Sequence, residues 1–165
     1  MARDALLPLA RRVGAALKSR RVLLATAESC TGGWIAQAVT AVPGSSAWFE
    51  RGFVTYSNEA KKEQLGVHAP TLARHGAVSE AVAREMASGA LARSRAQVAL
   101  AVIGVAGPDG GTKAKPVGTV CFSWARRGQA TLSATRRFPG GRNTVRRRAV
   151  IAALQGLLRS LGPPG

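Results

Sequence analysis

The sequence predicts a single α/β domain in which helices cover both faces of a mixed sheet. Short apolar runs typical of buried strands alternate with segments whose apolar residues recur every three or four positions, as in amphipathic helices. Near the C-terminus, two strand-like segments are separated by only four residues, which predicts an antiparallel hairpin. The length of 165 residues suits one domain, and no linker or internal repeat divides residues 1–165.

The first half of the chain predicts three helices and two strands. Leu6, Leu9, Val13 and Leu17 follow helical spacing, whereas RVLLATA is a short apolar run of the kind found in buried strands. Gly66 is a typical residue to close a helix. The predicted elements are a helix over 5–17, a strand over 21–27, a helix over 31–42, a strand over 48–57 and a short helix over 58–66.

The second half predicts two helices, a buried strand and the hairpin. Ser79 is a good N-cap, and Glu80 is favourably placed against the helix dipole. The segment 107–118 is too rich in Gly and Pro to be regular. The predicted elements are a helix from Ser79 to about Arg95, a strand over 97–107, hairpin strands over 119–125 and 130–138, a helix over 143–161 and a tail over 162–165.

Composition favours a soluble, cytoplasmic protein. Hydrophobic residues make up 46% of the chain, enough for a core. No apolar run reaches the roughly 18 residues that span a bilayer, and charges interrupt the first 21 residues as they would not in a signal peptide. We therefore expect no membrane partner. Two cysteines do not make a disulfide framework, which agrees with a reducing compartment.

The chain is strongly basic, with a net charge of +16 and eight arginines between Arg126 and Arg148. Such a field attracts anions, whether phosphorylated small molecules, nucleic acid or an acidic surface. The alternative is that these arginines only form a solvated face. Because no helix-turn-helix, zinc finger or RNA-binding aromatic motif accompanies them, we do not expect nucleic acid as a specific partner.

The segment TAESCTGGWIA (26–36) carries the first candidate site. A strand that ends there and turns into a helix places Ser29 near free backbone N–H groups, which favour negative charge. These are the parts of a nucleophile beside an oxyanion hole. The alternative is a helix capped by a hydroxyl, with glycines that serve tight packing. The candidate oxyanion and substrate-binding residues are Cys30, Thr31, Gly32 and Gly33.

A base for Ser29 is offered by the segment YSNEAKKEQLG (56–66). Tyr56 ends a predicted strand and Lys61 lies in the first turns of the next helix, and neighbouring strand ends of an α/β sheet can meet at one ligand site. A lysine acts as a base only when its pKa is lowered. The alternative is a solvated helix lysine. Neither His68 nor His75 has an evident Asp partner, so a Ser-His-Asp set is poorly supported.

Cys30 is a rival nucleophile, because a thiol at a helix N-terminus has a lowered pKa. Consecutive residues point in different directions, so at most one of Ser29 and Cys30 faces a substrate, and spacing alone does not decide between them. Cys121 lies in an apolar strand and is most simply a core residue. The cysteines and histidines lack metal-ligand spacing, so we expect no metal site.

The segment GVAGPDGG (104–111) follows the clearest buried strand. It is neither a P-loop nor a G-x-G-x-x-G fingerprint, but the backbone of such a loop can cradle an anion. We expect a phosphate or substrate site here together with Arg142. The candidate residues of the loop are Gly104, Val105, Ala106, Gly107 and Gly110.

Taken together, these motifs give the chain a resemblance to a known family. TAESCTGG, GFVTYSNEAK, HGAVSE, GVAGPDGG, KPVGTV and FPGGR occur in this order. The combination resembles the CinA C-terminal domain family, which includes nicotinamide-nucleotide amidases, over about residues 5–160. The resemblance implies a three-layer α/β/α sandwich that self-associates as a dimer or larger homo-oligomer. It also implies hydrolysis of the carboxamide of nicotinamide mononucleotide in pyridine-nucleotide salvage, with no cofactor.

The resemblance also implies roles for individual residues. It favours Ser29 as the nucleophile and Lys61 as its base, with Tyr56 as a relay or an orienting group. The chain departs from the common pattern at Ile103, where a threonine is frequent, at Gly141, where an aspartate is frequent, and at Trp34, where a smaller residue is usual. These departures concern substrate range more than reaction type. The alternative function is a basic binding or regulatory module without amidase activity.

Overall fold

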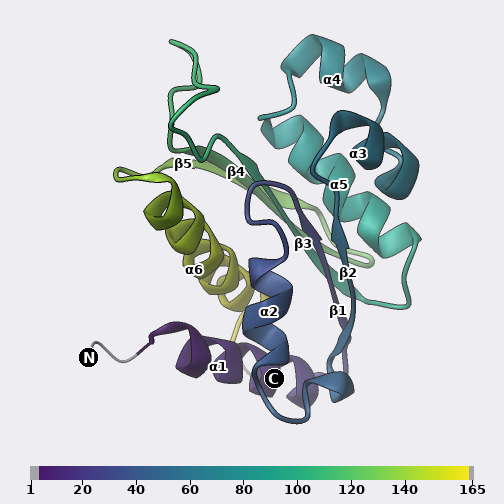
Figure 1. Cartoon of the computed structure of the whole chain (residues 1–165). Helices are drawn as coiled ribbons and strands as arrows, with labels where there is room; N and C mark the ends of the chain where they lie inside the picture. Colours follow the sequence, from purple (N-terminus) through teal and green to yellow (C-terminus); the bar gives the residue numbers. More distant parts are fainter. Residues whose placement is uncertain (1–3, 164–165) are drawn as a thin grey trace.

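A five-stranded mixed sheet forms the centre of the molecule in the computed structural model, which describes residues 4–163. The strands lie in the order β2-β1-β3-β4-β5 (Figure 1). β1 pairs in parallel with β2 and β3, whereas β3, β4 and β5 pair antiparallel, as the predicted hairpin requires. The strands are β1 (Leu24–Glu28), β2 (Phe49–Val54), β3 (Val98–Gly104), β4 (Thr119–Arg126) and β5 (Leu132–Arg137).

Helices cover both faces of this sheet, which confirms the three-layer α/β/α architecture (Figure 1). One layer contains α1 (Leu6–Ser19), α2 (Trp34–Thr40) and α6 (Arg142–Leu161), and the other contains α3 (Asn58–Leu65), α4 (Ala69–His75) and α5 (Glu80–Ala92). A short 3-10 helix, Ser45–Ala47, precedes β2. Among residues 4–163, no helix has the length and apolar character needed to cross a membrane.

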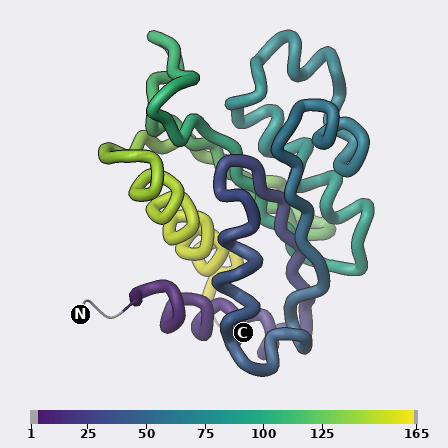
Figure 2. Tube along the Cα trace, viewed as in Figure 1, coloured from purple at the N-terminus to yellow at the C-terminus, as the bar shows by residue number. Residues whose placement is uncertain are grey.

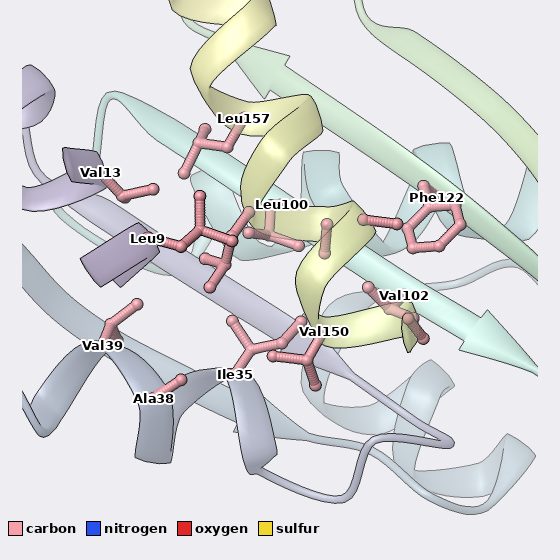
Figure 3. Packing of buried hydrophobic residues seen from close by; sticks show 14 of the residues in the cluster. Leu9, Val13, Ile35, Ala38, Val39, Leu100, Val102, Phe122, Val150 and Leu157 are labelled. Carbon is pink, nitrogen blue, oxygen red and sulfur yellow. The ribbon is translucent and has the colours of Figure 1, made fainter. Parts of the chain in front are cut away.

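Two apolar cores lie on the two faces of the sheet. On the α1, α2 and α6 side, Leu100, Val102 and Phe122 pack against Val150 and Leu157 (Figure 3). The intervening alanines of β3 face the opposite core, which α5 covers. Both faces of β3 are therefore buried, which is why its sequence is a continuous apolar run rather than an alternating one.

The structure differs from the predicted elements at α4 and at the start of α2, and β2 and β3 each end three residues before the predicted positions 57 and 107. α4 lies in a segment for which no helix was predicted. None of its residues is buried, so it has no apolar periodicity, although Pro70 suits its first turn. α2 begins at Trp34 rather than at residue 31, because Gly32 and Gly33 adopt positive φ angles of 60° and 102° and form a turn. Of the predicted domain and tail, residues 1–3 and 164–165 lie outside the described residues.

The carboxyl ends of the parallel strands meet at one edge of the sheet. Glu28, the last residue of β1, pairs with Val54 of β2 and Val102 of β3. The chain leaves β1 through α2 on one face, whereas it passes from β2 to β3 through α3, α4 and α5 on the other. Ligands of α/β sheets bind at the carboxyl ends of neighbouring strands whose connections pass to opposite faces of the sheet. The turn after β1, the 107–118 loop and α4 all lie at this end (Figure 2).

Candidate functional site

A cavity of about 310 Å³ opens at this edge of the sheet. It brings Ser29, Tyr56 and Lys61 to one place, together with Arg142 and the loop after β3. Thr31, Gly32 and Gly33 are absent from its wall and form the turn beside it. The lining residues are Ser29, Cys30, Tyr56, Asn58, Lys61, Ala77, Val78, Ile103, Gly104, Val105, Ala106, Gly107, Asp109, Gly110 and Arg142.

Glu28 organises the turn that carries Ser29. Its buried carboxylate accepts hydrogen bonds from the Thr31 hydroxyl at 2.6 Å and from the N–H groups of Ile35 and Ala36 at 2.8 and 3.1 Å. It thus replaces the side-chain cap that Gly33 cannot supply to α2. Burial raises the pKa of Glu28, and these hydrogen bonds oppose that shift. The sequence signal for this role was a single acid at the end of an apolar strand.

Ser29 lies directly after β1 and is 7% exposed. Its N–H donates to the Val102 carbonyl at 3.0 Å, which extends the pairing with β3, and its carbonyl accepts from the Gly32 N–H at 3.0 Å. The Gly32 N–H is therefore occupied within the turn. The Cys30 N–H makes no hydrogen bond to another residue within residues 4–163, and Cys30 belongs to the cavity wall, whereas Thr31 is fully buried and lies outside that wall.

Lys61 is buried, with only 2% of its surface exposed. Its Nζ donates to the backbone carbonyls of Tyr56 and Ser57 at 3.2 and 3.4 Å, and no carboxylate neutralises it among the described residues. Burial lowers the pKa of Lys61, as a lysine base requires. The solvated lysine of this helix is instead Lys62, which forms an ion pair with Glu59 at 2.6 Å.

Cys30 also lines the cavity, but its thiol is nearly buried at 5% exposure. Burial raises the pKa of the Cys30 thiol to about 12, which outweighs the favourable effect of nearby arginines. A thiol with this pKa stays protonated at neutral pH, and the thiolate is the reactive form of cysteine. The expected activation of Cys30 by the helix N-terminus is therefore absent, which favours Ser29.

Arg142 connects Tyr56 to the loop after β3. Its Nη2 donates to the Tyr56 hydroxyl at 3.1 Å, and its Nη1 donates to the Gly107 carbonyl at 2.7 Å. Tyr56 is 63% exposed and contacts Lys61 through its backbone carbonyl rather than its hydroxyl. Tyr56 is thus joined to Lys61 through the main chain, and Tyr56 is also one of the residues that line the cavity.

The loop after β3 is held in place at both ends. The Val105 N–H donates to Thr119 O and the Val105 carbonyl accepts from Gly118, each at 2.8 Å. Lys115 Nζ donates to the His75 carbonyl at 2.6 Å and fastens the loop to α4. His75 and His68 are absent from the cavity wall, and no cluster of three His, Cys, Asp or Glu residues able to hold a metal occurs within residues 4–163.

Known proteins share both the sequence and the fold. The chain is 55% identical over 152 residues to nicotinamide-nucleotide amidohydrolase PncC of Escherichia coli K12, which covers 92% of each chain. Identity to the PncC of Pseudomonas putida is 54% over 156 residues, covering 94% of this chain and 97% of that protein. The crystal structure of the competence/damage inducible protein CihA from Agrobacterium tumefaciens matches with a TM-score of 0.93 and 44% identity, covering 99% of both chains.

The family assignment rests on nearly the whole domain. The model of the CinA C-terminal domain matches residues 6–161, a range that contains every element of the sheet and the complete cavity wall. The chain belongs to the CinA C-terminal domain family.

Proposed function

We propose that this protein hydrolyses the carboxamide of nicotinamide mononucleotide to give nicotinic acid mononucleotide and ammonia, a reaction of pyridine-nucleotide salvage. The names of the relatives at 54–55% identity support this reaction. The observation that carries the proposal is the pairing of Ser29 with a buried, carboxylate-free lysine, Lys61, on one cavity wall. This combination supplies a nucleophile and a base where neither a histidine nor a metal ligand set lines the cavity among the described residues.

The chemistry follows the usual two steps of acyl transfer. Neutral Lys61 accepts the Ser29 proton as Oγ attacks the carboxamide carbon, and the lysine ammonium then protonates the departing amine as the C–N bond breaks. Ammonia leaves and a water replaces it. Lys61 takes a proton from this water, which attacks the acyl-enzyme, and Ser29 regains a proton as the carboxylic acid product forms. The N–H of Cys30, which follows Ser29 on the cavity wall, holds the oxyanion in both steps.

The two charges of the substrate have opposite partners on the cavity wall. Arg142 and the loop from Gly104 to Gly110 suit the phosphate, since a guanidinium and backbone N–H groups both bind phosphate oxygens. Asp109 is the one carboxylate among the lining residues and suits the positive pyridinium ring. Ile103 also lines the cavity and offers only an apolar surface, at the position where the family motif frequently has a threonine hydroxyl.

The test is ammonia release from nicotinamide mononucleotide by the purified protein and its variants. We expect Ser29→Ala and Lys61→Ala each to lower kcat by at least about 10³-fold, because residues that act as a unit lose most of their effect together. Two variants are matched controls. Lys62→Ala removes the neighbouring surface lysine and Cys30→Ala removes the buried thiol, and both should retain kcat within a few-fold.

Activity that survives both Ser29→Ala and Lys61→Ala would contradict the mechanism. A different result is that the wild-type protein releases no ammonia from the nucleotide and shows saturable binding to a nucleic acid of defined sequence. This result would contradict the amidase proposal and support the alternative function, a basic binding or regulatory module. Activity on another carboxamide in a substrate panel would keep the mechanism and change the substrate.

A further inference from the structure

A second cavity, of about 300 Å³, lies between the edge of the sheet and α6 (Figure 1). One side of it is formed by the last residues of β5 and the two residues that follow, and the other side is formed by α6. β5 is an edge strand, because it pairs with β4 and with no other strand among residues 4–163. None of the residues that line this cavity lines the cavity beside Ser29, so the proposed amidase chemistry does not use it.

The alternation of side chains along β5 places Arg136 and Phe138 on the side of the sheet that faces α6. Ser133 and Thr135 take the other side, where their hydroxyls donate to the Glu80 carboxylate at 2.6 and 2.7 Å. The carboxylate that bonds to β5 therefore lies across the sheet from Arg136 and does not neutralise it.

α6 brings a second arginine to the same cavity. The residues that it contributes are spaced three and four positions apart and so share one side of the helix: Arg148, Ile151, Ala152 and Gln155. Arg148 Nη1 donates to the Pro139 carbonyl at 3.3 Å, and the guanidinium carbon of Arg136 lies 5.0 Å from the centre of the Phe138 ring. These contacts hold two guanidinium groups at one cavity, one from the strand and one from the helix.

Both arginines are exposed, and neither forms an ion pair within the part of the chain that the structure describes. The cavity wall holds no carboxylate, and no acidic residue follows Asp109 in the sequence. Two like charges at one cavity repel each other, and an anion bound between them would remove this repulsion. A guanidinium also presents a planar fork of N–H donors that matches phosphate and carboxylate oxygens. The arginines therefore favour a negatively charged ligand.

Most of the remaining wall is apolar. It consists of Phe138, Pro139, Ile151 and Ala152, with Gln155 as a further polar residue. The Phe138 ring packs edge-on against the Phe122 ring of the core, with the ring centres 6.3 Å apart, so this wall is firmly supported. Apolar side chains around a few polar groups are typical of sites for small organic molecules, whereas an inorganic anion would use the arginines alone.

We propose that this cavity is a second ligand site, which binds a small organic anion. Arg136 and Arg148 bind its phosphate or carboxylate group, and Phe138, Pro139 and Ile151 contact its apolar body. The site goes beyond the proposed function and does not depend on it, because the two cavities share no residue. A second copy of the chain is a poorer occupant, since its net charge of +16 opposes contact with a basic surface.

The test is isothermal titration calorimetry of the full chain with naphthyl phosphate, which joins a phosphate group to an apolar ring system. We expect Arg136→Ala and Arg148→Ala each to raise Kd at least about fivefold, because each removes charge-assisted hydrogen bonds. Naphthol lacks the phosphate and inorganic phosphate lacks the rings, so each should bind at least about tenfold more weakly than naphthyl phosphate. Equally tight binding of either compound would overturn the proposal.

Arg137→Ala is the matched control on the same strand. It removes an equal charge one residue away from Arg136, but Arg137 does not line the cavity, so Kd should change less than about twofold. Arg142→Ala removes the arginine of the cavity beside Ser29 and should also retain binding. The Tm of each variant shows whether it is folded, and Arg136→Gln and Arg148→Gln, which keep most of the side chain, replace any alanine variant that is not.

Three further results would overturn the proposal. Equal rises in Kd for Arg136→Ala and Arg137→Ala would mean that binding follows net charge alone. Binding that Arg142→Ala abolishes and Arg136→Ala leaves unchanged would place naphthyl phosphate in the cavity beside Ser29. Self-association in sedimentation experiments that Arg136→Ala and Arg148→Ala disrupt, with no binding of naphthyl phosphate at millimolar concentration, would make this surface a contact between copies of the chain.

Discussion

At the scale of single residues, Lys61 and Lys62 show how neighbours of the same type acquire different chemistry. The sequence placed both lysines near the end of a strand, and the lone signal that distinguished them was the family motif. The structure buries Lys61 against the carbonyls of Tyr56 and Ser57, whereas Lys62 pairs with Glu59 at the surface. This difference depends on the packing of α3 against the rest of the domain, which spacing along the chain does not encode.

The burial of Lys61 predicts the pH dependence of activity. In the proposed mechanism the neutral amine of Lys61 is the active form, so kcat/KM should rise with pH through the pKa of Lys61. Because burial lowers this pKa, the rising limb should have its midpoint below about 10.4, the value of a free lysine. The measurement is a pH–rate profile of kcat/KM. Lys61→Arg should be inactive at every pH, because its guanidinium keeps its charge.

The same shift predicts a pH-dependent stability. Between the folded and the unfolded pKa of Lys61, the unfolded chain holds a proton that the folded protein has released, so the free energy of unfolding rises with pH in this window. Lys61→Met should lack this pH-dependent contribution to the free energy of unfolding.

For the pH–rate profile, a rising limb of kcat/KM centred at the ordinary lysine pKa would contradict the role of Lys61 as a base of lowered pKa.

At the scale of the elements, the buried strands and the caps Ser79 and Gly66 were predicted, whereas the cap of α2 and the helix α4 were not. A buried strand such as β3 can be predicted from its continuous run of apolar residues. α4 has no buried residue, so its sequence shows no apolar periodicity from which a helix could be predicted. The start of α2 was predicted three residues early because its cap is the carboxylate of Glu28, which reaches forward from the preceding strand. Such a cap depends on the backbone turn, which no local spacing rule describes.

α6 lacks a side-chain cap at its N-terminus, so a substitution that supplies one should raise the free energy of unfolding. Its N-cap is Gly141, with φ −74° and ψ 174°, and a Cβ built there meets nothing within 4 Å. Gly141→Asp should therefore stabilise the fold by about 0.5–1 kcal/mol, through a cap on the free N–H groups and its charge at the helix N-terminus. For a protein of this size that gain raises Tm by about 1–4 °C.

Thermal unfolding of Gly141→Asp and Gly141→Ala would measure this effect. Alanine adds the same Cβ without an acceptor, so Gly141→Ala should be no more stable than the parent. Equal Tm values for the two variants would show that the gain does not come from capping. Activity is measured separately, since Arg142 is the next residue and contacts Tyr56.

At the scale of the whole molecule, the sequence predicted the α/β/α layers and the strand edge at which Ser29, Tyr56 and Lys61 meet. Among the many arginines it singled out Arg142, which lines the cavity, but not Arg146, which contacts the turn after Ser29. Arg142 and Arg146 both lie near the start of α6 and reach the site from the far end of the chain, whereas Arg147 on the same helix pairs with Asp4. The distinction arises from the rotation of α6 against the sheet, a tertiary property.

The net charge of +16 predicts how salt affects substrate capture. Nicotinamide mononucleotide is anionic at neutral pH because its phosphate outweighs the pyridinium charge, so the field of the protein attracts it. We expect kcat/KM to fall several-fold between about 0.05 M and about 0.5 M sodium chloride, as the Debye length shortens, with kcat nearly constant. Nicotinamide riboside lacks the phosphate and is a cation, so any turnover of it should respond to salt in the opposite direction. A fall of equal size for both substrates would mean that salt acts on the folded protein rather than on the approach of the anion.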